Sequence, residues 1–115
     1  MTDLVHDVDA PSDAELISRV RGGDVAAYGE LFSRHVDAAK RLSRQLVRGP
    51  DADDLVSEAF AKVLTVLQGG GGPDVAFRAY LLTSVSSRYI AVQRRHSSRW
   101  AWTLVLSRVA RPLRT

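Results

Sequence analysis

A run of four glycines followed by a proline, at residues 69–73, constrains the fold of this chain more than any other feature. Glycine loses more backbone freedom in a helix than other residues, and proline lacks the amide donor that a helix interior requires. Two further breaks, Gly22-Gly23 and Gly49-Pro50, interrupt the chain in the same way. The breaks separate segments of ordinary helix length, so the sequence predicts an all-α fold with a flexible loop at the glycine run.

Helix-start signals stand beside the breaks. Ser12-Asp13-Ala14-Glu15 has the spacing of a capping box, in which each side chain accepts from the other residue's free backbone N–H. It predicts a first helix that begins at Ser12 and ends near Arg21. Acidic residues follow each later break, and carboxylates stabilise a helix start through its free N–H groups and dipole. They are Asp24 for the second helix, Asp51, Asp53 and Asp54 for the third, and Asp74 for the fourth.

Apolar residues recur at three- and four-residue steps between the breaks, which is the spacing of one buried helix face. The second segment places on such a face Tyr28, Leu31, Phe32, Ala38, Ala39, Leu42 and Leu46. The third places there Leu55, Val56, Ala59, Phe60, Val63, Leu64 and Leu67, and the fourth Phe77, Tyr80, Leu81, Val85 and Tyr89. One apolar face per helix predicts a compact bundle of about four helices around a single core.

The chain of 115 residues is long enough for one modest core and too short for two ordinary domains. Its hydrophobic content of 45% and charged content of 25% are typical of a folded globular protein. We expect a flexible acidic leader over residues 1–11 and a helical domain over residues 12–98. Residues 99–115 form a basic, Trp-containing tail whose structure the sequence leaves open, although its apolar residues allow a helix.

Several classes of protein are excluded by what the sequence lacks. Without cysteine there is no disulfide and no thiolate metal site, which fits a reducing compartment. The acidic N-terminus does not resemble a secretory signal, and no apolar run approaches the length of a membrane span. His6, His35 and His96 are scattered, so their spacing indicates neither a catalytic pair nor a metal site. We therefore expect a cytoplasmic protein that is not an enzyme, binds no cofactor or metal and does not associate with a membrane.

Charge is distributed unevenly along the chain. All 13 acidic residues lie at or before Asp74, and only basic charges follow. They are Arg78, Arg88, Arg94, Arg95, Arg99, Arg108, Arg111 and Arg114. A block of one sign produces a local positive potential that attracts phosphate backbones. The pattern favours a nucleic-acid partner, with a solvated basic surface as the alternative.

Three stretches between about Asp13 and Arg95 form a recognisable series. The first is Asp13-Ala14-Glu15-Leu16-Ile17 with Arg21-Gly22-Gly23-Asp24 and the residues up to Phe32; the second is Asp51-Ala52-Asp53-Asp54-Leu55-Val56-Ser57-Glu58-Ala59-Phe60; the third is Phe77-Arg78-Ala79-Tyr80-Leu81-Leu82-Thr83, with Arg94-Arg95. Together they resemble conserved region 2 of bacterial sigma factors of the extracytoplasmic-function class. The resemblance implies a domain that binds core RNA polymerase and recognises and melts the −10 promoter element.

The resemblance also implies where polymerase binds. In the family, the polar side of the third helix docks on a coiled coil of the polymerase's largest subunit, which assigns Asp54, Ser57 and Glu58 to polymerase binding. Asp54 and Glu58 are four residues apart and share a helix face, so they can pair with arginines of a partner. Stabilisation of the helix start is the alternative for the aspartates but not for Glu58.

The resemblance also implies DNA contacts for the loop over residues 69–75, here called the glycine loop, and for the helix after it. In the family, this loop captures a flipped base of the −10 element. The matching positions are Gly71, Gly72, Asp74, Arg78, Tyr80, Thr83, Ser87, Arg88, Arg94 and Arg95. The arginines are suited to phosphates. Tyr80 stands where the family usually has Trp, and its ring either stacks on a base or belongs to the core.

The chain departs from the family pattern in several places. The family typically has Gln where this chain has Ser57, positive charge near Ser86, Asn in place of Ser87 and Asp in place of Ala91. Family members also carry a second domain that reads the −35 element, and no part of this chain resembles it. The alternative function is therefore a degenerate interaction module that binds polymerase or an anti-sigma factor without opening DNA. An ordinary DNA-binding regulator is disfavoured, because the later half contains no recognisable helix-turn-helix pair.

Overall fold

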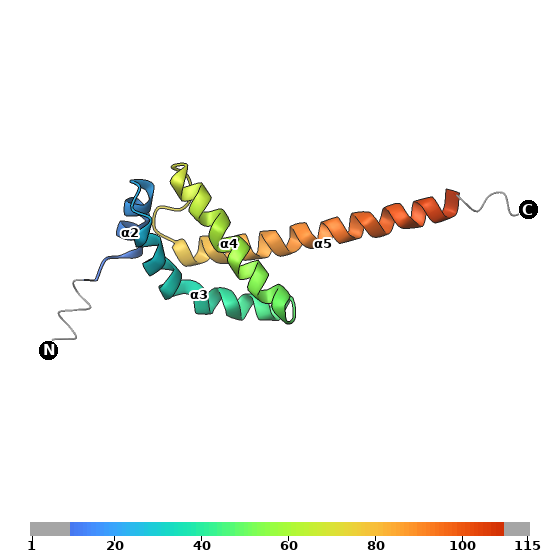
Figure 1. Cartoon of the computed structure of the whole chain (residues 1–115), viewed down its shortest axis with the longest axis horizontal. Helices are drawn as coiled ribbons and strands as arrows, with labels where there is room; N and C mark the ends of the chain where they lie inside the picture. Colours follow the sequence, from blue (N-terminus) through green and yellow to red (C-terminus); the bar gives the residue numbers. More distant parts are fainter. Residues whose placement is uncertain (1–9, 110–115) are drawn as a thin grey trace, which may run out of the picture.

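A computed structural model describes the backbone of residues 10–109 and the side chains of residues 10–95. Four helices follow one another: α2 (Asp13–Arg21), α3 (Ala26–Leu46), α4 (Pro50–Gln68) and α5 (Phe77–Val109). The first three pack with the beginning of α5 into a bundle, and the rest of α5 extends away from it (Figure 1). No strand occurs within residues 10–109, so the predicted all-α bundle is confirmed.

The beginning and end of α2 follow the sequence signals. Glu15 N–H donates to Ser12 Oγ at 3.1 Å, and Gly22 ends the helix with Gly23 at a φ of 105°. The Glu15 carboxylate lies 4.0 Å from Arg19, and its predicted bond with Ser12 N–H is absent from the described hydrogen bonds. Only half of the capping box therefore forms.

Two predicted caps are wrong. The N-cap of α3 is Val25, without a side-chain hydrogen bond, and Asp24 contributes only its backbone carbonyl, which accepts from Ala27 N–H at 3.2 Å. Asp74 does not cap α5, because its carboxylate is bound to Arg21 at 2.7 Å and the helix begins at Phe77. For α4 the prediction is confirmed, since Pro50 opens the helix and aspartates lie in its first turn.

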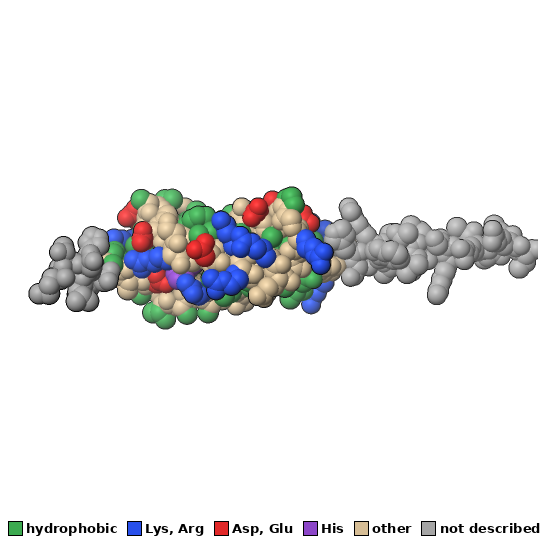
Figure 2. Space-filling model, turned by 90° about the horizontal axis from the view of Figure 1, so that it is seen from below, with side chains coloured by type: hydrophobic (Ala, Val, Ile, Leu, Met, Phe, Trp, Pro, Cys, Tyr) green, Lys and Arg blue, Asp and Glu red, His purple; other side chains and the backbone are tan. Residues whose placement is uncertain are grey.

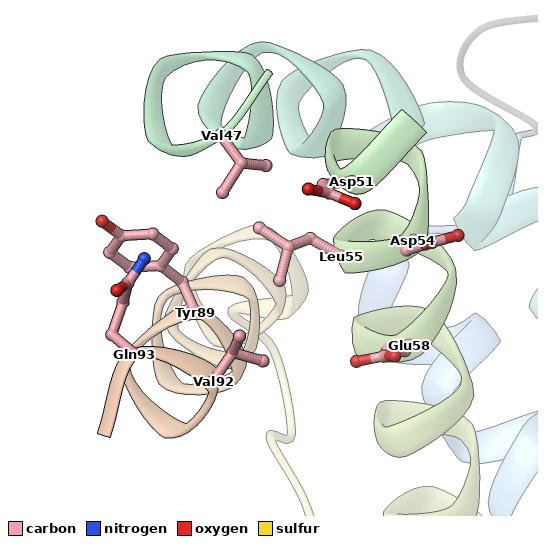
Figure 3. Close-up of a pocket in the computed structure, with 8 residues that line it drawn as sticks. All are labelled: Val47, Asp51, Asp54, Leu55, Glu58, Tyr89, Val92 and Gln93. Atoms are coloured by element: carbon pink, nitrogen blue, oxygen red, sulfur yellow. The ribbon is translucent and has the colours of Figure 1, made fainter. Parts of the chain in front are cut away.

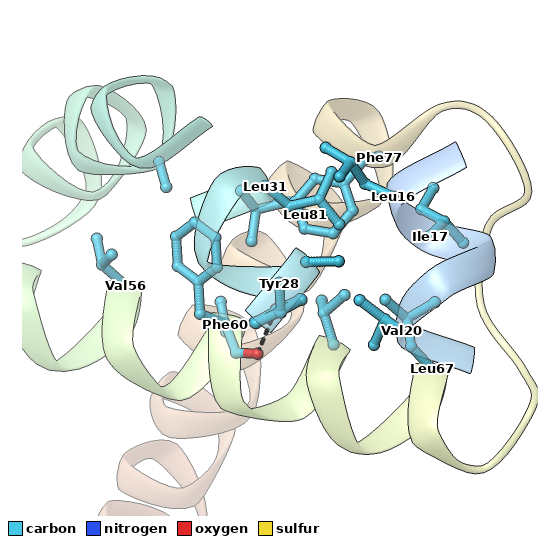
Figure 4. Close-up of a cluster of buried hydrophobic side chains, with 14 of the residues drawn as sticks. Leu16, Ile17, Val20, Tyr28, Leu31, Val56, Phe60, Leu67, Phe77 and Leu81 are labelled. Carbon is cyan, nitrogen blue, oxygen red and sulfur yellow. Dashed lines mark hydrogen bonds between the residues drawn. The ribbon is translucent and has the colours of Figure 1, made fainter. Parts of the chain in front are cut away.

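The core lies where the four helices meet. Most of the residues predicted from the apolar spacing belong to it. The buried apolar residues of the core are Leu16, Ile17, Val20, Ala27, Tyr28, Leu31, Ala39, Val56, Ala59, Phe60, Val63, Leu67, Phe77, Leu81 and Val85. The Tyr28 hydroxyl donates to the Phe60 carbonyl at 2.6 Å (Figure 4), and burial raises the pKa of this phenol. The other predicted members are buried or partly buried except Phe32, which is 42% exposed and covers the Phe60 ring from outside.

Ser43 is the one buried side chain in the described part of the chain whose polar atom has no hydrogen-bond partner. An unsatisfied buried hydroxyl costs about 1–3 kcal/mol. We therefore expect Ser43→Ala to stabilise the domain by about 1 kcal/mol, measured as a shift of the urea unfolding midpoint. Ser33→Ala, on the exposed side of α3, controls for the change in helix propensity. A Ser43→Ala domain less stable than wild type would contradict this expectation.

The helix α5 continues without a break past residue 98 to Val109. The backbone of the predicted tail is therefore helical as far as the structure describes it, while residues 110–115 and most of the predicted leader, residues 1–9, lie outside the described residues. The division into leader, domain and tail stays a prediction. Within the described residues, no helix is long and apolar enough to cross a membrane.

Candidate functional site

The predicted polymerase-binding residues lie on the outer side of α4. Asp54, Ser57 and Glu58 are all exposed, whereas Leu55 and Val56, between them in sequence, are buried. This separation follows from the helical period, since the apolar positions turn toward α3 and α5. The fold thus brings the three predicted residues together on one helix surface.

A hollow of about 290 Å³ lies beside this surface, between the end of α3, the start of α4 and the middle of α5. Apolar side chains of Val47, Leu55, Tyr89 and Val92 line it, together with Gln93 and the carboxylates of Asp51, Asp54 and Glu58 (Figure 3). We call this the acidic hollow. An apolar lining beside carboxylates suits a lysine or arginine that buries its aliphatic stem and pairs its charge.

Glu58 is also bound within the domain. Arg88 of α5 donates to Glu58 Oε2 from Nε at 3.0 Å and from Nη2 at 2.8 Å. The two side chains are 39% and 46% exposed, and such surface pairs contribute only about 0–1 kcal/mol. Glu58, predicted to bind polymerase, and Arg88, predicted to bind DNA, therefore pair with each other. The pair is weak enough for either side chain to exchange it for another partner.

Four of the predicted DNA-binding residues lie together on α5. Tyr80, Thr83, Ser87 and Arg88 line a second hollow of about 390 Å³, with Lys62, Ser84 and Ala91. Tyr80 is half-buried, packs against the core and also lines this hollow, while stacking of its ring on a base stays a prediction. The Thr83 hydroxyl donates to the Ala79 carbonyl at 2.9 Å. Arg94 and Arg95 are exposed further along the helix.

Arg78 lies apart from this group. Its Nε donates to His35 Nδ1 at 3.2 Å, and His35 Nε2 lies 2.7 Å from Asp13 Oδ2. Because a guanidinium only donates, Nδ1 must accept, and the ring proton on Nε2 donates to Asp13. Asp13 also binds Arg34 at 3.0 Å. Arg78 thus joins α5 to α3 and α2, a role that no sequence pattern indicated.

The glycine loop is folded around Arg21 at the end of α2. Arg21 Nη2 donates to the carbonyls of Gly71, Gly72 and Pro73 at 2.9, 3.0 and 2.8 Å. Its Nε also donates to Gly71 at 3.2 Å, and Nη1 donates to Asp74 at 2.7 Å. The loop that the sequence predicts to be flexible is therefore bound to α2. No sequence signal singled out Arg21.

Gly72 allows this loop conformation. Its φ is 87°, and a Cβ there would lie 3.0 Å from Leu67 Cδ2. A side chain at this position would strain the backbone, and the Leu67 methyl would have to shift by a few tenths of an ångström. The positive φ is therefore the main reason for glycine here.

The basic block of the sequence is not a purely basic surface in space. Figure 2 shows Lys and Arg side chains along one face of the bundle with acidic side chains among them. Arg88 pairs with Glu58, and Arg78 is linked through His35 to Asp13. Acids from earlier segments thus offset part of the positive charge that the sequence pattern predicts. Among the side chains that the structure describes, no group of three His, Cys, Asp or Glu residues could hold a metal.

Residues 31–100 match the family model of sigma-70 region 2. No curated protein and no solved structure gives a significant match. The matched range includes the acidic hollow, the second hollow and the glycine loop, whereas α2 with Arg21 precedes it. Membership of the extracytoplasmic-function class stays a prediction. Since the match takes in well over half of the chain and both predicted binding surfaces, the chain belongs to the sigma-70 region 2 family of transcription initiation factors.

Proposed function

We propose that this domain binds core RNA polymerase through α4 and recognises and melts the −10 promoter element through α5 and the glycine loop. The observation that supports this most is the arrangement of α4 and α5. The acidic hollow and the second hollow both lie between these helices, and the Glu58–Arg88 pair joins them. One rigid unit can thus hold polymerase on one side and DNA on the other. The proposal places the domain in the bacterial cytoplasm.

The polymerase contact is proposed for Asp54, Ser57 and Glu58 with the acidic hollow. A coiled coil of the polymerase's largest subunit that presents arginines would find carboxylates for its charges and an apolar lining for its aliphatic stems. Ser57 is exposed on the same surface and offers a hydroxyl. The exposure of all three residues in the free domain supports this assignment.

The DNA contact is proposed for the second hollow, the exposed arginines of α5 and the glycine loop. Tyr80 lines the hollow and can stack on an unpaired base, with Thr83 and Ser87 beside it as hydrogen-bonding groups. Arg88, Arg94 and Arg95 are suited to the phosphates. Arg78 is better explained as a structural link than as a phosphate ligand, because its guanidinium is bound to His35.

The test of DNA binding is the double substitution Arg88→Ala with Arg95→Ala. We expect weaker binding to single strands of any sequence, because phosphate contacts are independent of sequence. The slope of log affinity against log salt should become shallower by about 0.7 for each phosphate that the variant no longer neutralises. Fluorescence anisotropy of a labelled random single strand, with the domain bound to core polymerase, measures both.

Arg41→Ala removes an exposed charge on α3 and serves as the control. It should leave the affinity and the slope unchanged. If the double variant binds like wild type, the arginines of α5 form a solvated surface.

The alternative function is an interaction module that binds polymerase or an anti-sigma factor without opening DNA. The pairing of Arg88 with Glu58 and the small side chain of Ala91 in the second hollow favour it. The two functions differ in one result. The interaction module would retain polymerase and show no salt-dependent binding of single strands.

A further inference from the structure

The guanidinium of Arg21 is the centre of the glycine loop. All three of its nitrogens donate, and the acceptors are three consecutive carbonyls and the Asp74 carboxylate. The Arg21 side chain is only 25% exposed, although it belongs to the last turn of a short helix. Arg19 lies on the same helix and is exposed, and the one ion pair of its side chain among the described residues is with Glu15 at 4.0 Å.

A loop of four glycines has little conformational preference of its own, because glycine populates more backbone conformations than any other residue. Gly70 and Gly72 both adopt positive φ, at 89° and 87°. Gly71 N–H donates to the Val66 carbonyl, and the next described backbone bond of the loop is from Phe77 N–H to the Val75 carbonyl. Between Gly71 and Asp74, the loop is held in one conformation by its hydrogen bonds with Arg21 and by the packing of Gly72 on Leu67.

We propose that Arg21 is a positioning residue that holds the glycine loop in the conformation that selects a base of the promoter strand. This inference rests on the proposed function of the loop. Arg21 binds Asp74 Oδ1, yet the Asp74 side chain remains 85% exposed, so its other oxygen can accept from a base amino group. The N–H groups of Gly72, Asp74 and Val75 have no acceptor among the described residues and can donate to a base edge or phosphate. Without Arg21, the Asp74 carboxylate and these N–H groups would no longer be held in one fixed arrangement.

The experiment compares wild type with Arg21→Ala, Arg21→Lys and Arg19→Ala. Lysine keeps the charge but lacks the planar fork that reaches several acceptors at once. Two properties are measured: the backbone mobility of the loop in the free domain, from the ¹⁵N NMR order parameters of its amides, and the sequences that the domain bound to core polymerase enriches from a random single-strand pool. Arg21→Lys is the milder variant should Arg21→Ala not fold.

We expect Arg21→Ala to lower the order parameters at residues 71, 72, 74 and 75, because the loop backbone loses the contacts that hold it, while the core amides stay as rigid as in wild type. Its enrichment of preferred bases should fall about tenfold, since a well-formed hydrogen-bonded base contact discriminates by that order. The salt slope of strand binding should not change, because the Arg21 guanidinium is committed to the loop and not to a phosphate. Arg21→Lys should lie between wild type and Arg21→Ala, and Arg19→Ala should behave as wild type.

Unchanged loop order parameters in Arg21→Ala would overturn the inference, whatever the DNA result. Lower order parameters with undiminished enrichment would also overturn it, because the loop conformation would then not select the base. Absence of enrichment by wild type would instead contradict the proposed function, and the role of Arg21 in base selection with it. The wild-type result therefore distinguishes failure of the proposed function from failure of this inference alone.

Discussion

Replacing Asp54 and Ser57 with arginine should lower the affinity of the domain for core polymerase by about 100-fold, because like charges at an interface cost several kcal/mol. Both residues are exposed on α4, so the substitutions leave the core intact. They also leave the Glu58–Arg88 pair intact, whereas Glu58→Arg would place two arginines face to face. Co-purification of the tagged domain with core polymerase measures the effect.

Asp37→Arg is the control, since it repeats the aspartate-to-arginine reversal of Asp54 at an exposed position of α3 that lines neither hollow. It should retain polymerase. The helical circular-dichroism signal of the double variant should equal that of wild type. A folded double variant that still retains polymerase would show that the α4 surface is not the docking site.

Phe77→Ala should unfold the domain or nearly so. Phe77 is fully buried at the first residue of α5, and its ring contacts those of Tyr28, His35 and Phe60 at centroid distances of 6.0, 5.2 and 6.5 Å. Truncating a buried phenylalanine costs about 3–5 kcal/mol, a large share of the stability of a small domain. The truncation would free the start of α5 from the other helices. Urea unfolding followed by circular dichroism measures it.

Phe32→Ala makes the same truncation on an exposed ring, which lies 4.6 Å from Phe60 by centroid. We expect a destabilisation of about 1 kcal/mol or less, since little apolar area is removed from the interior. Comparable destabilisation of the two variants would mean that Phe77 does not anchor α5 as described.

The sequence predicted the helices and most of the core because both depend on local signals. Glycine breaks, the Ser12 cap and apolar spacing all act within a few residues, and α2 and α4 each end directly before the glycine that stops them. The prediction for Phe32 was wrong because periodicity places a residue on a face but does not say how far the neighbouring helices extend over it.

Asp74 illustrates the limit of local reasoning. Its position before a helix suggested a cap, but a guanidinium 53 residues earlier in the chain competes for the carboxylate and binds it. The Glu58–Arg88 pair likewise joins residues 30 apart, which sequence assigned to separate partners. Such contacts depend on how helices cross, and no spacing rule within one helix contains that information. The sequence could therefore predict which residues share a helix face. It could not predict the ion pairs and hydrogen bonds that join one helix to another.

Base selection by the polymerase-bound domain is the property on which the proposed function depends most. It is tested by selection from a random pool of single strands by core polymerase alone and by core polymerase with the domain, followed by sequencing. We expect a short recurring motif to be enriched only when the domain is present. The same sequence distribution in both selections would contradict the proposed function.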